Sequence, residues 1–175
     1  MKKLVSTLLL ICLVVGVFSG CHGALDRESF AIPEEFDTSR TYEITFWAKN
    51  DTNLTQVEIY RQAIEDFEAL YPNIKVTMRL YTDYGRIYND VITNIATNTT
   101  PNVCITYPDH IATYMTGANV VVPLDGLFAD DKYGLGGSEL LFDSPTRAEI
   151  IPQFLQECAF NGHHYAIPYM RSTEA

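Results

Sequence analysis

Hydrophobic and polar positions follow two different periods in the segment after residue 41. Tyr42 to Trp47 reads YEITFW, a mixture of β-branched and aromatic residues that favours a strand. From Leu54 to Tyr71, apolar residues recur every three or four positions, which is the spacing of one helix face, and Pro72 ends the run. Ile74 to Tyr81 alternates apolar and polar residues, so it predicts a second strand with one buried face.

The same order of elements then repeats. Asp83 is suited to cap a helix whose apolar stripe runs from Tyr84 to Ile95. Residues 98–101 break the pattern, and Val103 to Thr106 is a short apolar run typical of a central strand that is buried on both faces. Strands that alternate with helices predict a mostly parallel sheet flanked by helices, an α/β fold.

The last third of the chain is less regular. It predicts a short helix from Asp109 to Thr116, a helical turn after Pro123, a surface loop from Asp130 to Ser138 and a helix from Thr146 to Glu157. Asn161-Gly162 separates two short runs and favours a tight hairpin, because both residues tolerate a positive φ.

The first twenty residues have a different character. Lys2 and Lys3 precede fifteen uncharged residues, a run too short to span a bilayer comfortably, which indicates an export signal over residues 1–20. The segment Phe18-Ser19-Gly20-Cys21, which begins at the last residue of this run, resembles the bacterial lipobox, in which the cysteine receives lipid. Phe18 departs from the small aliphatic residue preferred at its position. The resemblance implies lipidation at Cys21. The alternative is a plain signal peptide followed by an incidental cysteine.

Residues 21–41 lack apolar periodicity and predict a flexible tether, which leaves residues 42–175 as one compact domain. Two cysteines, Cys104 and Cys158, lie in that domain. Outside the cytoplasm they could form a disulfide or remain buried thiols, and their spacing does not decide between the two.

The charge of the chain excludes one class of partner. The formal charge of −10 becomes −12 when the two lysines of the signal are removed, so we expect no nucleic-acid binding. We also expect no metal and no cofactor. Neighbouring residues on a strand point to opposite faces, so His163 and His164 could not easily share a metal, and no HExxH or GxSxG motif is present.

Five segments, taken in order, resemble the first lobe of the extracellular solute-binding proteins of ABC importers, in particular their carbohydrate-binding group. They are ITFW (44–47), FEALYPNIKV (67–76), VITNIATNTTPNVCITYPDH (91–110), GANVVVPLDGLF (117–128) and FNGHHYAIPYMRST (160–173). One departure is Asn102, where the family often has an acid. The resemblance implies a periplasmic-binding-protein type II-like first lobe of a longer, two-lobed receptor that closes on its ligand at a hinge.

Candidate site residues follow from the strand order. Ligands of open parallel sheets lie beyond the carboxyl ends of the strands, which selects Trp47, Asn50 and Asp51 after the first strand and Tyr107 and Asp109 after the third. Aromatic rings stack on the C–H faces of sugars, and amides and carboxylates bind their hydroxyl groups. The alternatives are a core aromatic for Trp47 and a helix N-cap for Asp109.

Arg171, Ser172 and Thr173 resemble the polar turn of the family that faces the cleft at the entry to the hinge. The alternative for these three residues is a polar surface turn.

The function implied by the resemblance is capture of a small sugar or sugar derivative and its delivery to an ABC permease by a receptor anchored through lipid on the extracytoplasmic face of the cell membrane. Two other classes stay open. One is an exported scaffold or adhesin. The other is a lipid-anchored hydrolase, for which His110 beside Asp109, together with His163 and His164, are the groups of residues 42–175 suited to proton transfer at neutral pH.

Overall fold

The computed structural model describes residues 31–49, 54–117 and 119–170. The predicted export signal and several candidate residues lie outside this part of the chain, namely Cys21, Asn50, Asp51, Arg171, Ser172 and Thr173. Over the three described ranges, no helix combines the length and the apolar character needed to cross a membrane.

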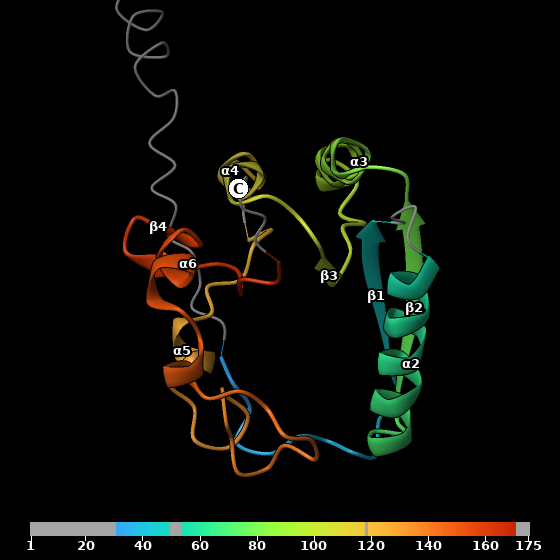
Figure 1. Cartoon of the computed structure of the whole chain (residues 1–175), viewed down its shortest axis with the longest axis vertical. Helices are drawn as coiled ribbons and strands as arrows, with labels where there is room; N and C mark the ends of the chain where they lie inside the picture. Colours follow the sequence, from blue (N-terminus) through green and yellow to red (C-terminus); the bar gives the residue numbers. More distant parts are fainter. Residues whose placement is uncertain (1–30, 50–53, 118, 171–175) are drawn as a thin grey trace, which may run out of the picture.

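A three-stranded parallel sheet forms one side of the molecule (Figure 1). Its strands are β1 (Tyr42–Lys49), β2 (Ile74–Tyr81) and β3 (Val103–Cys104), in the order β2-β1-β3. β1 and β2 pair along their whole length, from Tyr42 opposite Ile74 to Lys49 opposite Tyr81. The predicted α/β fold with a parallel sheet is therefore confirmed.

The third strand differs from the prediction. It contains two residues instead of four, it pairs only with β1 among the described residues, and Val103 is 52% exposed, so it is not a central strand buried on both faces. The side chain of Asn102 explains where the ladder begins. Its Oδ1 accepts hydrogen bonds from the backbone N–H of Thr45 (2.9 Å) and from Thr45 Oγ1 (3.0 Å), so that backbone donor is not available to a longer ladder.

Two helices cover opposite faces of the sheet. Phe46 meets Tyr60 of α2 (Leu54–Leu70) edge to face, with 5.8 Å between ring centroids. The next residue, Trp47, packs in one buried cluster with Ile87 of α3 (Tyr84–Ile95). Because successive side chains of a strand point to opposite faces, α2 lies on the Phe46 face and α3 on the Trp47 face.

The start and the buried stripe of α3 agree with the prediction. The carboxylate of Asp83 accepts a hydrogen bond from the backbone N–H of Arg86 (2.9 Å), which satisfies one of the amide groups at the helix start. Ile87 is fully buried, and Val91 is buried one turn later. Burying a side chain of this kind stabilises a fold by about 1.5–3 kcal/mol, so this stripe secures α3 to the sheet.

The predicted helix from Thr146 to Glu157 is wrong as a single element. The structure has a 3₁₀ turn at Arg147–Glu149 and then a separate helix, α6 (Pro152–Gln156). Pro152 is the cause, because its ring disfavours a helical backbone at the preceding residue, and Ile151 has a ψ of 118°.

Shorter elements complete the opposite side of the molecule (Figure 1). They are α4 (Pro108–Tyr114), α5 (Asp125–Phe128), β4 (Ala159–Phe160) and β5 (His163–His164). The predicted hairpin is confirmed, since β4 and β5 pair antiparallel and their turn residues Asn161 and Gly162 have φ values of 51° and 83°.

Residues 31–41, the second half of the predicted tether, lie against the domain. The Phe36 ring stacks on Tyr42 at 5.2 Å and meets Tyr71 edge to face at 6.5 Å. The backbone N–H of Phe36 donates a hydrogen bond to Tyr133 Oη (2.9 Å), and Lys132 Nζ donates one to the carbonyl of Glu34 (2.9 Å). This segment thus connects the sheet with the loop that follows α5.

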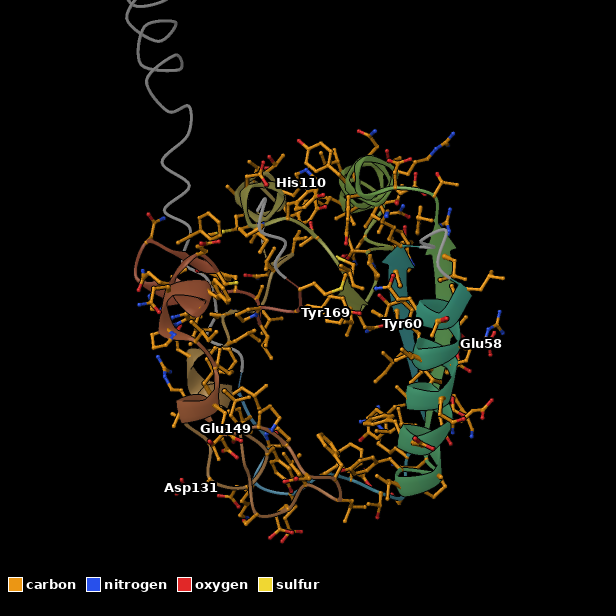
Figure 2. The ribbon with its side chains drawn as sticks, in the orientation of Figure 1. Glu58, Tyr60, His110, Asp131, Glu149 and Tyr169 are labelled. Atoms are coloured by element: carbon orange, nitrogen blue, oxygen red, sulfur yellow. The ribbon has the colours of Figure 1, made fainter. Side chains whose placement is uncertain are left out.

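A second contact joins the two sides of the molecule. Figure 2 shows Tyr169, near the end of the described chain, pointing toward Tyr60 of α2. The hydroxyl of Tyr169 donates a hydrogen bond to the hydroxyl of Tyr60, with 2.8 Å between the oxygens. The chain therefore returns to the sheet after the β4-β5 hairpin.

Candidate functional site

Tyr107 stands just beyond the carboxyl end of β3, where a parallel sheet is expected to bind ligands. It is the N-cap of α4, and its backbone is extended (φ −84°, ψ 150°), as a residue that precedes proline requires. Its side chain does not cap the helix, and the residue is 49% exposed. About half of Tyr107 is thus accessible to a partner.

Tyr107 contacts the rings of Tyr84 and His110, and His110 contacts Tyr88; we call these four residues the aromatic cluster. Tyr84 lies 4.6 Å from Tyr107 between centroids, at an interplanar angle of 46°, and His110 lies 5.4 Å away at 76°. Tyr88 contacts His110 at 4.3 Å. Figure 2 shows His110 between α4 and α3; α3 contains Tyr84 and Tyr88, and Tyr107 directly precedes α4. Planar rings with polar tips suit the C–H faces and hydroxyl groups of a sugar.

A hydroxyl network lies beneath the cluster. Thr106 Oγ1 is 3.4 Å from His110 Nδ1 and 3.2 Å from the hydroxyl of Tyr114, which is buried in the core. Burial raises the pKa of Tyr114 to about 12, although the hydrogen bond with Thr106 acts in the opposite direction. At neutral pH this hydroxyl therefore keeps its proton and can serve as a donor.

The aromatic cluster borders a cavity of about 700 Å³, whose walls include Tyr84 and Tyr107. The cavity lies between β3, α4 and the segment that ends at Met170. Most of its walls are apolar, including Phe46, Val103, Ile111, Val121, Tyr165 and Ile167. Apolar walls cannot satisfy the many hydroxyl groups of a sugar, so we place the candidate site at the aromatic cluster and not deep in the cavity.

The cavity wall also contains Cys104. Burial raises the pKa of its thiol to about 11, so the thiol is protonated at neutral pH and is a poor nucleophile. Cys104 and Cys158 are both free thiols in the structure.

The structure buries Trp47, whereas Tyr107 is half exposed. Trp47 is only 6% exposed and packs against Tyr81, with 5.3 Å between ring centroids, and it does not line the cavity. The guanidinium of Arg79 lies 5.0 Å from the centre of its ring. This environment agrees with the alternative interpretation, that of a core aromatic.

Asp109 lies beside Tyr107 in the first turn of α4 and is exposed. It is not the N-cap that the alternative interpretation required, because Tyr107 holds that position. A carboxylate in the first turn of a helix is stabilised by the helix dipole. The structure therefore keeps Tyr107 and Asp109 on one turn, and their contact with a ligand stays a prediction.

Tyr84 and Tyr88 pack against the core cluster of Trp47, as expected for the apolar stripe from Tyr84 to Ile95. The sequence analysis did not predict their ring contacts with Tyr107 and His110. A signal was available, because Tyr84 and Tyr88 are four positions apart and Tyr107 and His110 are three apart. Such spacings place two rings on one face of a helix.

A second polar cluster lies where α5 meets the β4-β5 hairpin. His164 Nδ1 lies 2.7 Å from Asp125 Oδ1, and His163 Nδ1 lies 3.1 Å from Asp125 Oδ2. The backbone N–H of His164 also donates to Oδ2, at 3.1 Å. The two adjacent histidines, expected to face apart, thus share one carboxylate because each reaches a different oxygen. In the described part of the chain, no three His, Cys, Asp or Glu residues are arranged to hold a metal.

The Asp125 cluster predicts acid sensitivity. Partial burial raises the pKa of Asp125. Hydrogen bonds from the side chain and backbone of His164 and from the side chain of His163 lower it by more than burial raises it, so the pKa lies below its ordinary value. A carboxyl whose pKa is lower in the folded state stabilises the fold above its unfolded pKa of about 4, and this stability is lost as the pH falls through the folded pKa.

We therefore expect the free energy of unfolding to decrease below about pH 4, and the Asp125→Asn variant to lose this contribution to the decrease. Urea denaturation from pH 6 to pH 2.5 measures both curves. The matched control is Asp131→Asn, which changes an exposed carboxyl outside the cluster. Parallel pH curves for the wild type and Asp125→Asn would contradict the prediction.

Comparison with known proteins gives a family match over most of the described chain. Residues 51–175 match the family model of bacterial extracellular solute-binding proteins. No curated protein matches the chain.

Solved structures share the fold. An extracellular solute-binding protein family 1 from Alicyclobacillus acidocaldarius has a TM-score of 0.56 and 19% identity, over 73% of this chain and 28% of that chain. The GacH receptor of Streptomyces glaucescens, studied unliganded and with acarbose, has a TM-score of 0.53 and 22% identity, over 73% of this chain and 28% of that chain. The maltose/maltodextrin-binding domain MalE of Bdellovibrio bacteriovorus, bound to maltotriose, has a TM-score of 0.51 and 21% identity, over 71% of this chain and 27% of that one.

These likenesses, all below 25% identity, show the fold. The chain spans little more than a quarter of the length of each of these proteins.

Proposed function

Because this chain belongs to the bacterial extracellular solute-binding proteins, we propose that it forms the first lobe of a receptor that captures a small carbohydrate and delivers it to an ABC importer. The observation that carries the proposal is the half-exposed ring of Tyr107, which lies among Tyr84, Tyr88 and His110 beyond the end of β3. The structures of similar fold that hold acarbose and maltotriose support a sugar as the ligand.

The proposed binding mode assigns separate roles to the rings and the polar groups. Tyr107 stacks on the C–H face of a sugar ring, and Asp109, in the first turn of α4, accepts hydrogen bonds from its hydroxyl groups. We include Asn50 and Asp51 after β1, and Arg171, Ser172 and Thr173 at the end of the chain, as further polar contacts. Trp47 is left out because it is buried in the core.

Capture requires two surfaces. A lobe with one half-exposed ring covers only one side of a sugar, so we propose that a second lobe closes over the ligand at a hinge and excludes water from it. Closure would also change the shape that the permease recognises.

We further propose that the receptor is held at the membrane through lipid on Cys21, with residues 22–30 between the lipid and the packed segment that starts at residue 31. A single acyl chain gives only reversible membrane binding, whereas two signals are needed for stable anchoring. A diacylated cysteine would meet that requirement, and the acidic domain would not add to it.

The experiment that tests the proposed function is isothermal titration calorimetry of the mature full-length protein with maltotriose, acarbose and a panel of other short oligosaccharides. We expect at least one of these sugars to bind with a dissociation constant in the micromolar range or below, and to raise the melting temperature of the protein because it binds the folded state only. A folded protein that binds none of the sugars would contradict a carbohydrate receptor and would favour the scaffold interpretation.

A further inference from the structure

We propose that His110 is a positioning residue for Tyr107, and that its imidazole holds the Tyr107 ring in the orientation in which it stacks on a sugar. This inference rests on the proposed function, since it takes Tyr107 as the sugar contact. The two residues lie three positions apart, one before and one within α4, and their rings are 5.4 Å apart between centroids.

The backbone of Tyr107 is already held in place, but its ring is not. Pro108 restricts Tyr107 to an extended conformation, which is the one observed. The two side-chain torsions remain, and because Tyr107 is half exposed, core packing cannot hold the ring on its open side. Its ring contacts are with Tyr84 at 4.6 Å and with His110, so these two neighbours restrict its rotation.

His110 is well suited to restrict the ring because it is itself attached at three points. Its backbone N–H donates a hydrogen bond to the carbonyl of Tyr107 (3.1 Å), and its Nδ1 lies 3.4 Å from Thr106 Oγ1. Its ring packs on Tyr88 of α3 at 4.3 Å. Thr106 is in turn linked to Tyr114, which is buried in the core. The orientation of His110 is therefore set by the core.

The contact between His110 and Tyr107 is one between two rings, so a planar ring is the property that matters. Phenylalanine at position 110 keeps the ring and loses only the long contact with Thr106. Alanine at position 110 removes the ring and, among the described residues, leaves Tyr84 as the one ring in contact with Tyr107. We expect the alanine variant to reduce sugar affinity about threefold to tenfold, the range that one aromatic pair supplies.

The first test needs no sugar. Full-length protein labelled with 3-fluorotyrosine gives a fluorine NMR spectrum in which Tyr107→Phe identifies the signal of Tyr107 by its loss. We expect His110→Ala to shift and sharpen that signal as the ring gains freedom, and His110→Phe to leave it broad and close to its original position. The matched control is His163→Ala, because the His163 ring contacts Asp125 and not Tyr107. This variant should leave the Tyr107 signal in place. An unchanged Tyr107 signal in His110→Ala overturns the inference.

The second test separates the positioning role from a direct one. Calorimetry with maltotriose should show the threefold to tenfold loss for His110→Ala and recovery to within about twofold for His110→Phe. In a Tyr107→Ala background, His110→Ala should have no further effect, because the ring that it positions is gone. The same loss in both backgrounds would overturn the inference.

The two tests also separate failure of the inference from failure of the proposed function. If Tyr107→Ala does not change the affinity for maltotriose, the sugar contact assigned to Tyr107 is wrong, and a positioning role toward a sugar is overturned with it. If the affinity falls in Tyr107→Ala while the fluorine signal is unchanged in His110→Ala, only the positioning role is overturned. Unchanged signals of tyrosines that lie outside the aromatic cluster, such as Tyr42 and Tyr71, show that each variant is folded.

Discussion

The Trp47→Ala variant is expected to lower the free energy of unfolding by about 3–5 kcal/mol, the cost of removing a large aromatic side chain from a packed interior. Trp47 is 6% exposed and shares its cluster with Tyr81, Ile87, Val91 and Tyr114. Its removal would leave a cavity between β1 and α3, where the surrounding helix and strand can relax only in part. Urea denaturation of the full-length protein, followed by circular dichroism, measures the loss.

The matched control for Trp47 is Trp47→Phe, which keeps one ring against Tyr81 and should cost less than half as much. Arg79 adds a cation–π contact to Trp47 that is worth about 0.5–1 kcal/mol at an exposed site, so Arg79→Ala should cost considerably less than the loss of the ring. A Trp47→Ala protein of unchanged stability that had lost sugar affinity would instead return Trp47 to the ligand site.

The Tyr107→Ala variant is expected to show the opposite pattern, with a large effect on binding and a small one on stability. Removal of a central aromatic contact typically costs about 2 kcal/mol of binding free energy, which corresponds to roughly a thirtyfold increase in the dissociation constant. Because Tyr107 is half exposed, we expect its loss to change the free energy of unfolding by less than about 1 kcal/mol. Calorimetry with the tightest sugar of the panel and urea denaturation measure the two quantities.

Tyr107→Phe is the control that separates the ring from the hydroxyl group. If stacking provides the affinity, the phenylalanine variant should bind within about threefold of the wild type. A phenylalanine variant as weak as the alanine variant would mean that the hydroxyl of Tyr107, and not its ring, contacts the sugar. Unchanged affinity in both variants would remove Tyr107 from the site.

Together, the two alanine variants test whether Trp47 stabilises the fold while Tyr107 binds the ligand. The sequence placed Trp47 and Tyr107 at the ends of neighbouring strands and both are aromatic, so a shared site was predicted, but Trp47 lies inside β1, two residues before its end. The structure buries the first under α3 and leaves the second half exposed at the start of α4. One residue stabilises the sheet that holds the other.

The sequence alone determined the local elements. The alternation of Ile74 to Tyr81 predicted β2 with its observed bounds, Asp83 predicted the cap of α3, and Asn161-Gly162 predicted the hairpin turn. These features depend on residues within a few positions of one another, so periodicity, capping and turn preference are sufficient to predict them. The parallel sheet followed from the alternation of strands with helices.

Only the tertiary structure decided which side chains face one another. It buried Trp47, brought Tyr84 and Tyr88 of α3 against Tyr107 and His110, and joined His163 and His164 to one carboxylate. These contacts link residues from about 20 to about 40 positions apart, and which of them form depends on how the helices dock on the sheet. A periodic pattern shows that a face is buried or exposed, but the partner of that face is set by packing.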